Sequence, residues 1–146
     1  MTPRTAGGSE VSEKPKVLLV DDDAAFLKAI GLVLAQAGYT VFTAEDGKAG
    51  LAVAREHKPD AIVIDVVMKR PDEGFALSRA IRADADLSRA KMLILTAVGQ
   101  HYQMLFEPDE QWLPVAKVLE KPITGDALAS EISALLAAPT QSEEDV

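Results

Sequence analysis

The fold of this chain is decided by one stretch, Asp60-Ala61-Ile62-Val63-Ile64-Asp65-Val66-Val67-Met68. Its Ala, Ile and Val residues follow one another without polar alternation, which is typical of a strand covered on both faces in a parallel α/β sheet. Ligands of open α/β sheets bind outside the carboxyl ends of the strands, so Asp65 lies where chemistry is usually done. A single acid at a strand end could equally be a turn former or a helix cap. Whether Asp65 has a functional role therefore has to be judged from the residues at the other strand ends.

The composition indicates one globular domain. The chain has 146 residues, 48% of them hydrophobic, and 15 basic against 23 acidic residues give a net charge of -8, which argues against a basic nucleic-acid-binding surface. The absence of cysteine excludes disulfides, a thiolate nucleophile and cysteine-ligated zinc. No apolar run reaches the ~20 residues of a membrane span and no signal peptide is visible, so we expect a cytoplasmic protein without a membrane partner.

Local composition sets the expected domain boundaries. Residues 1–14 are rich in Thr, Gly, Ser, Glu and Pro and have little to bury, which predicts a disordered tail. Residues 15–138 are expected to form the folded domain, and residues 139–146 an acidic C-terminal tail. Neither tail has room for a second domain.

Strand and helix patterns alternate along the domain. Apolar runs predict strands at residues 16–20, 39–43, 60–68, 92–95 and 116–119. Helices are expected to begin near Asp23, Asp46, Phe75 and Thr124. The segment 98–114, where a fourth helix belongs, is irregular because glycine and prolines interrupt it. This order predicts a doubly wound α/β domain with a parallel five-stranded sheet.

Two helices carry apolar stripes that predict which of their faces is buried. The first should begin at an N-cap on Asp23 and end before Gly38. Its predicted stripe consists of Phe26, Ile30, Val33 and Ala37. The last helix should begin at an N-cap on Thr124, and its predicted stripe consists of Leu128, Ile132 and Leu135.

Polar residues follow four of the five strands. They are Asp21 and Asp22, Asp65, Thr96 and Lys121. Carboxylates that meet at one sheet edge repel one another, and an all-oxygen ligand set suits Mg²⁺. An ammonium and a hydroxyl could then receive phosphate oxygens, and a carboxylate could accept a phosphoryl group. Lys121 alone could instead be an internal counterion, and Thr96 a residue that only fills a strand end, but their joint occurrence favours a phosphoryl site.

These motifs resemble the receiver domain of bacterial two-component response regulators. The matching pieces, in the family's order, are Val17 to Asp23, Asp60 to Met68, Leu95-Thr96-Ala97 and Glu120-Lys121-Pro122. The resemblance covers residues 15–138. It implies a single-domain CheY-like switch with a flavodoxin-like (βα)5 fold that signals through protein–protein contacts and is not an enzyme.

The resemblance also implies roles for individual residues. Asp65 would accept a phosphoryl group from a histidine kinase or histidine phosphotransfer protein. The implied magnesium ligands are Asp21 (through water), Asp22, Asp65 and the carbonyl of Val67. Thr96, the amide of Ala97 and Lys121 would receive the phosphoryl group. The Lys121-Pro122 peptide would be cis, a form that is rare except before proline.

The chain departs from the family pattern at three places. Lys69 stands where a proline usually follows Met68, and Val118 replaces the usual switch aromatic, for which Tyr102 and Trp112 are the candidate substitutes. The third departure is the irregular segment 98–114. With the strand and helix that follow it, this segment makes the family's output face, which is where we expect a downstream protein, and a homodimer is left open.

Two further functions compete with the phosphorylated switch. A receiver that acts as a scaffold without phosphorylation would explain the missing aromatic, although the complete set of site residues argues against it. A haloacid-dehalogenase-type phosphohydrolase would use Asp21 as its nucleophile, but that motif expects Thr or Val where this chain has Ala25. A dinucleotide site is disfavoured because three acids occupy the turn where glycines would cradle phosphate.

Overall fold

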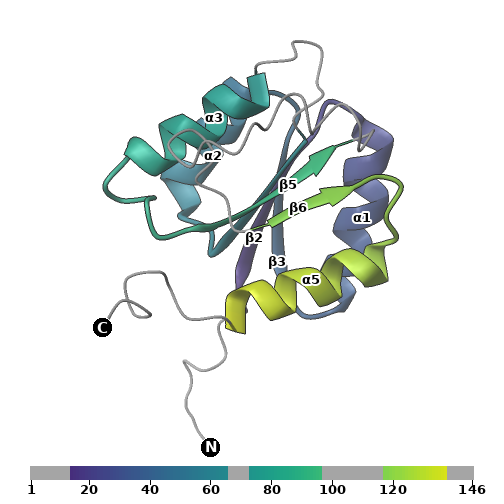
Figure 1. Ribbon diagram of the computed structural model, residues 1–146. Helices are drawn as coiled ribbons and strands as arrows, with labels where there is room; N and C mark the ends of the chain where they lie inside the picture. The colour runs from purple at the N-terminus through teal and green to yellow at the C-terminus, as the bar shows by residue number, and fades with distance from the viewer. Residues whose placement is uncertain (1–13, 66–72, 97–116, 138–146) are drawn as a thin grey trace, which may run out of the picture.

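The computed structural model describes residues 14–65, 73–96 and 117–137 (Figure 1). Strands and helices alternate along these ranges in the expected order, except between the last two strands, where residues 97–116 lie outside the described part of the chain. In sequence they are β2 (Lys16–Val20), α1 (Ala24–Gln36), β3 (Thr40–Ala44), α2 (Gly47–His57), β4 (Ala61–Asp65), α3 (Glu73–Ala83), β5 (Lys91–Thr96), β6 (Lys117–Glu120) and α5 (Gly125–Ala137).

The strands form one parallel sheet in the order β3-β2-β4-β5-β6. Val17 is in register with Val41 on one side and with Ala61 on the other. The chain therefore moves outward from β2 to β3, returns past β2 to β4, and continues in the opposite direction. The gap between the ends of β2 and β4 is the topological switch point, where open α/β sheets bind their ligands.

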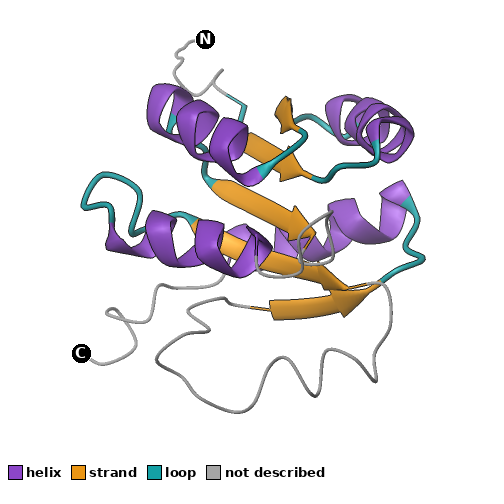
Figure 2. Ribbon diagram, turned by 90° about the horizontal axis from the view of Figure 1, so that it is seen from above, coloured by secondary structure: helices purple, strands orange, loops and turns teal. Residues whose placement is uncertain are grey.

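Helices cover both faces of the sheet, as the doubly wound prediction requires. The pairs α2 with α3 and α1 with α5 lie on opposite sides (Figure 1), and the view from above shows the strands between the two helix layers (Figure 2). Successive residues of one strand serve the two cores: Val20 packs on the α2–α3 side and Leu19 on the α1–α5 side. Because both faces are covered, the central strands have no polar alternation.

The first helix is capped as predicted but rotated relative to its predicted stripe. Asp23 is the N-cap, with its side chain accepting a hydrogen bond from the Phe26 N–H, and Gly38 has φ = 108°. The buried residues of α1 are Leu27, Ile30 and Leu34. The predicted stripe is therefore correct only in part: Ile30 is buried, but Phe26 and Val33 are half-buried and Ala37 is exposed. Apolar residues surround most of this helix, so several stripes fit the sequence and packing selects one.

The other helices agree more closely with the predictions. Asp46 caps α2, and the Thr124 hydroxyl accepts a hydrogen bond from the Ala127 N–H at the start of α5. The residues expected in the core of α5 are buried, namely Leu128, Ile132 and Leu135. Helix α3 begins at Glu73, two residues before its predicted start at Phe75.

Several expectations concern residues that the structure does not describe. They include residues 1–13 of the N-terminal tail, the whole C-terminal tail, Val67, Ala97 and the entire segment 98–114, as well as the side chains of Thr96 and Val118. Within the described ranges, no helix is long and apolar enough to cross a membrane.

Candidate functional site

Asp21 is the first residue after β2, and local hydrogen bonds fix its side chain. Its backbone N–H donates to the Ala44 carbonyl at 3.1 Å, which extends the pairing of β2 with β3 by one residue. Its Oδ1 accepts the Asp23 N–H at 2.9 Å, at the start of α1. Asp21 is only 2% exposed. These contacts leave Oδ2 directed toward the end of the sheet.

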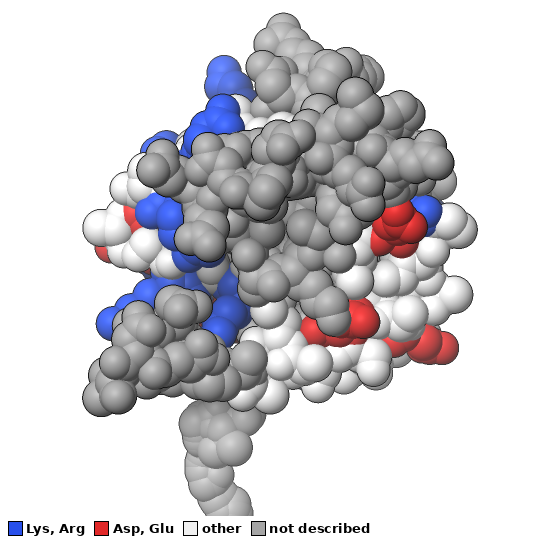
Figure 3. Space-filling view, viewed as in Figure 1, with Lys and Arg blue, Asp and Glu red and all other residues white. Residues whose placement is uncertain are grey.

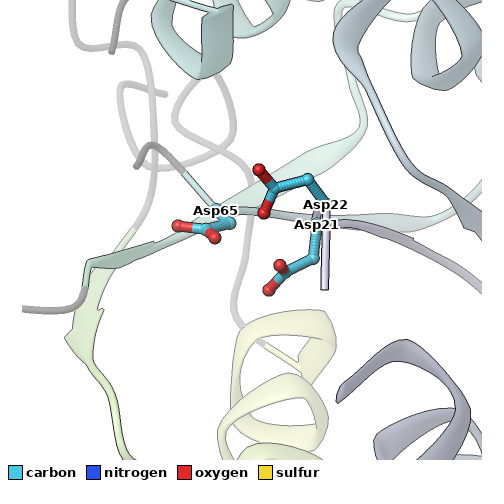
Figure 4. Close-up of side chains that lie close together, drawn as sticks. All are labelled: Asp21, Asp22 and Asp65. Atoms are coloured by element: carbon cyan, nitrogen blue, oxygen red, sulfur yellow. The ribbon is translucent and has the colours of Figure 1, made fainter. Parts of the chain in front are cut away.

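Asp65 closes β4 on the other side of the switch point. It is in register with Leu95 of β5 and is 4% exposed. Asp22 is half-buried, and its carboxylate, with those of Asp21 and Asp65, offers oxygens that all lie within 4.8 Å of one another. Figure 4 shows the three side chains extending from the ends of β2 and β4 into one region.

Lys121 provides the positive charge of the site. Its Nζ lies 2.7 Å from Oδ2 of Asp21 and 3.4 Å from Oδ2 of Asp65. Burial by itself would lower the pKa of Lys121, but the hydrogen bond to Asp21 and the charges of Asp65 and Asp21 outweigh it and raise that pKa above its ordinary value. The ammonium is therefore retained in the site. The Lys121-Pro122 peptide is cis, which confirms that prediction.

The charges of the cluster fit a divalent cation. Among the described residues, the cluster combines three carboxylates with one ammonium. Two carboxylates 4 Å apart repel each other by about 1 kcal/mol in water and about 4 kcal/mol at an effective dielectric constant of 20. Their oxygens lie close enough to share one ion. Oxygen ligands without nitrogen or sulfur suit a hard ion such as Mg²⁺. The donor set of Asp21, Asp22 and Asp65 therefore fits the expected magnesium.

Only part of the predicted phosphoryl site falls within the described residues. Asp21, Asp22, Asp65 and Lys121 are brought together as expected. The backbone of Thr96 ends β5, in register with Glu120 and therefore at the same edge of the sheet. The Thr96 side chain, Ala97 and Val67 lie outside the described part of the chain.

Phe26 is a site neighbour that sequence reasoning assigned only to the core. Its ring centroid lies 4.2 Å from the Lys121 Nζ. The two side chains, with Asp23, Pro122 and Ile123, line an open groove of about 300 Å³ beside the cluster. The only sequence signal was an aromatic in the first turn of the helix that follows the acids.

Charge is unevenly distributed over the surface. Exposed Arg79 and Arg89 belong to α3 and the turn that follows it, whereas Asp22, Asp23 and Glu120 lie at the carboxyl ends of strands. Figure 3 shows Lys and Arg gathered on the α3 side of the visible face, with Asp and Glu toward the α1 side. Among the described residues, the edge that carries the site is therefore acidic, which favours the approach of cations.

The fold and cluster define a doubly wound α/β domain with a cluster of three carboxylates at its switch point. The model of the response regulator receiver domain matches residues 17–133. The chain belongs to the response regulator receiver domain family, and thus to the signalling proteins of two-component phosphorelays.

Individual relatives agree with this assignment. The protein PilH of Pseudomonas aeruginosa is 32% identical over 125 residues, covering 84% of this chain and 98% of PilH. The DNA-binding dual master transcriptional regulator RpaA of Synechocystis is 37% identical over 86 residues, covering 59% of this chain and 35% of RpaA. This chain thus spans nearly all of PilH but about a third of RpaA.

Solved structures support the same fold. The chemotaxis response regulator CheY4 of Vibrio cholerae has a TM-score of 0.73 and 28% sequence identity, and the match covers 84% of this chain and 98% of CheY4. The similarity favours a receiver over the haloacid-dehalogenase-type alternative.

Proposed function

We propose that this receiver is a phosphorylation switch whose phosphoacceptor is Asp65. The observation that carries the proposal is the buried Asp65 carboxylate with an ammonium 3.4 Å away and two further carboxylates beside it. The donor would be the phosphohistidine of a histidine kinase or histidine phosphotransfer protein. A carboxylate oxygen of Asp65 would form the new bond to phosphorus, while the nitrogen–phosphorus bond of the donor breaks and its electron pair returns to the imidazole.

The acidic cluster would hold Mg²⁺ during the transfer. By the family resemblance, Asp22 and Asp65 would bind the ion directly, Asp21 would bind it through water, and the Val67 carbonyl would complete the protein's ligands. When bound, the ion supplies positive charge that lets an anionic carboxylate approach an anionic phosphoryl group. Asp21 also holds Lys121 in place, because their ion pair is 2.7 Å long.

Lys121, Thr96 and the Ala97 amide would receive the transferred group. Lys121 is already beside the acceptor oxygen, so phosphorylation would replace a carboxylate–ammonium contact with a phosphoryl–ammonium contact. Recruitment of Thr96 at the end of β5 would change the population of surface states that a downstream protein recognises. The expected contact surface is segment 98–114 with β6 and α5. We expect this signalling to take place in the cytoplasm without nucleic acid or membrane contact.

Intact-protein mass measurement tests the proposal directly. The wild-type chain is incubated with a small acyl phosphate, with and without Mg²⁺, and followed over a time course that would detect short-lived adducts. The expected result is one phosphoryl adduct that requires Mg²⁺. Asp65→Asn should remove the adduct because the variant keeps the shape of the side chain but lacks the nucleophilic oxygen.

The matched control is Asp23→Asn. It makes the same chemical change at the same edge of the sheet, on a residue that caps α1 and is not part of the cluster of Asp21, Asp22 and Asp65. Asparagine is an equally good N-cap. This variant should still form the adduct. If the wild type binds Mg²⁺ but never gains a phosphoryl group, the proposal fails and a scaffold that acts without phosphorylation becomes the better account.

A further inference from the structure

Lys121 contacts an aromatic ring as well as two carboxylates. Its Nζ is 4.2 Å from the centroid of the Phe26 ring, a distance typical of a cation–π contact. Phe26 lies in the first turn of α1, and its N–H is bonded to the Asp23 cap at 3.1 Å. The ring is half-buried against the core between the sheet and the α1–α5 layer. It is therefore anchored on one side and faces the ammonium on the other.

The carboxylates and the ring hold the ammonium in different ways. Asp21 and Asp65 attract Lys121 through their full negative charges, but they are also the residues that fit a divalent cation. A cation bound to them would offset that attraction and repel the ammonium. The face of an aromatic ring keeps its negative potential whether or not the carboxylates are neutralised.

We infer that Phe26 is a positioning residue that keeps the Lys121 ammonium beside Asp65 when the acidic cluster holds a cation. This inference rests on the proposed phosphoacceptor function and deepens it. Lysine has a long flexible stem and a strongly hydrated head, and a groove of about 300 Å³ opens next to it. Without the ring, a repelled ammonium can swing into this groove. The ring thus preserves the contact that the phosphoryl group will need.

A purely structural role for Phe26 predicts a different pattern of variant effects. If the ring only fills space in the core, leucine or methionine should replace it with little consequence for Lys121, because both are apolar and of similar volume. If the ring holds the ammonium, only another aromatic can substitute. Phe26→Leu, Phe26→Met and Phe26→Tyr therefore separate the two roles.

The first measurement is the NMR signal of the Lys121 Cε protons in protein labelled with ¹³C-lysine, assigned by its loss in Lys121→Met. Protons that lie over a ring face resonate upfield of those of other lysines. In the wild type this upfield position should persist when Mg²⁺ is added. Phe26→Leu and Phe26→Met lose the ring-current shift wherever the ammonium lies, so their readout is the response to Mg²⁺. Adding Mg²⁺ should move their Lys121 signal to the position of exposed lysines if the ring holds the ammonium, and should leave it unchanged if the ring only fills space. Phe26→Tyr should keep the upfield position with and without Mg²⁺.

The matched control is Phe42→Leu, since Phe42 is half-buried on the opposite face of the sheet and stacks on His57. It loses the same ring far from the cluster and should leave the Lys121 signal unchanged. A wild-type signal at the exposed-lysine position, or a Phe26→Leu signal that does not respond to Mg²⁺, would overturn the inference.

The second measurement is the rate of Mg²⁺-dependent phosphorylation by a small acyl phosphate. Phe26→Leu should slow it roughly 2- to 10-fold, the range that a lost cation–π contact allows, with the Mg²⁺ dissociation constant little changed and Phe26→Tyr close to wild type. An unchanged rate in Phe26→Leu would count against the inference. If the wild type takes no phosphoryl group, the proposed function fails, while the NMR comparison still decides whether Phe26 positions Lys121.

Discussion

The ammonium of Lys121 lies 2.7 Å from the carboxylate of Asp21, a residue 100 positions earlier in the chain. Asp21 follows β2 and Lys121 follows β6, and these strands are separated in the sheet by β4 and β5. The ion pair therefore ties the end of the last strand across the switch point to the end of the first. With Asp21 only 2% exposed, its charge has little water around it and depends on the lysine.

Replacing Lys121 by methionine should destabilise the protein when no cation is present. Breaking a fully buried ion pair costs about 3–5 kcal/mol. The Lys121 side chain is 20% exposed, so we expect a smaller loss for Lys121→Met, about 1–3 kcal/mol in the free energy of unfolding. Urea denaturation without Mg²⁺ measures it. Saturating Mg²⁺ should narrow the difference from wild type, because the ion replaces the missing positive charge.

A penalty that is the same with and without Mg²⁺ would contradict this expectation. It would mean that the lysine supports the fold through its aliphatic stem or its neighbours, and that the carboxylates are not the groups that need the charge.

Replacing Asp22 by asparagine should have the opposite effect and stabilise the protein when no cation is present. Its carboxylate oxygen lies within 4.8 Å of those of Asp21 and Asp65, both of which are paired with Lys121. Asp22→Asn removes repulsion of about 1 kcal/mol per pair and should raise the free energy of unfolding without Mg²⁺ by about that amount. The same change should weaken Mg²⁺ binding. Urea denaturation measures the free energy of unfolding, and titration calorimetry measures the affinity for Mg²⁺.

Asp23→Asn is again the matched control, because it changes the neighbouring acid outside the cluster and preserves a good N-cap. It should alter neither stability nor Mg²⁺ affinity appreciably. Loss of stability in Asp22→Asn would show that repulsion within the cluster is not what limits the folded state without the ion.

Much of the sheet could be predicted because its physics is local. Runs such as Lys16–Val20 and Ala61–Asp65 are short, apolar and free of alternation, and that pattern belongs to strands buried on both faces. Parallel strands place their carboxyl ends at one edge, so the meeting of Asp21 with Asp65 and Lys121 also followed from position along the chain. The caps at Asp23 and Thr124 followed from their side-chain chemistry.

The remaining features depend on tertiary contacts. The rotation of α1 could not be predicted, since Leu27 and Phe26 are both apolar and only packing against the sheet decides which is buried. The ring of Phe26 over Lys121 joins residues distant in sequence. No sequence pattern indicated a role for Glu73 either. Its carboxylate accepts the Gly47 N–H at 2.6 Å and joins the start of α3 to the start of α2.

Asp84 should contribute to stability only above acidic pH. Its carboxylate accepts the Asp86 N–H at 2.9 Å and the Arg55 side chain at 3.1 Å, and these contacts, the Asp86 bond first, lower the pKa of Asp84. A lowered folded-state pKa adds stability above the unfolded-state pKa and loses it as the pH falls through the folded-state value. Asp84→Asn should therefore be less stable than wild type at neutral pH.

That difference should disappear in acid, below the folded-state pKa of Asp84. Thermal unfolding of both proteins across the acidic range gives the measurement. In an Arg55→Met background the neutral-pH difference should be smaller, because one of the two contacts is gone. A difference that persists unchanged into acid would mean that the charge of Asp84 is not its source.

Gly125 at the start of α5 should tolerate no larger side chain. A Cβ there would lie 2.6 Å from the Cβ of Val33 on α1 and 2.7 and 2.8 Å from its two methyl groups, so the two helices would have to separate. Gly125→Ala should cost about 1–3 kcal/mol in the free energy of unfolding, as overpacking does. Val33→Ala should recover only part of this loss of stability, because the Cβ of residue 33 remains.

Gly31→Ala is the matched control. Its Cβ would lie 3.6 Å from Val41, which is an ordinary contact. Gly31 also lies inside α1, where alanine is favoured over glycine by about 1 kcal/mol. Denaturant unfolding of the variants should thus give opposite signs for the two glycines, and a stabilising Gly125→Ala would show that α1 and α5 can separate at no cost.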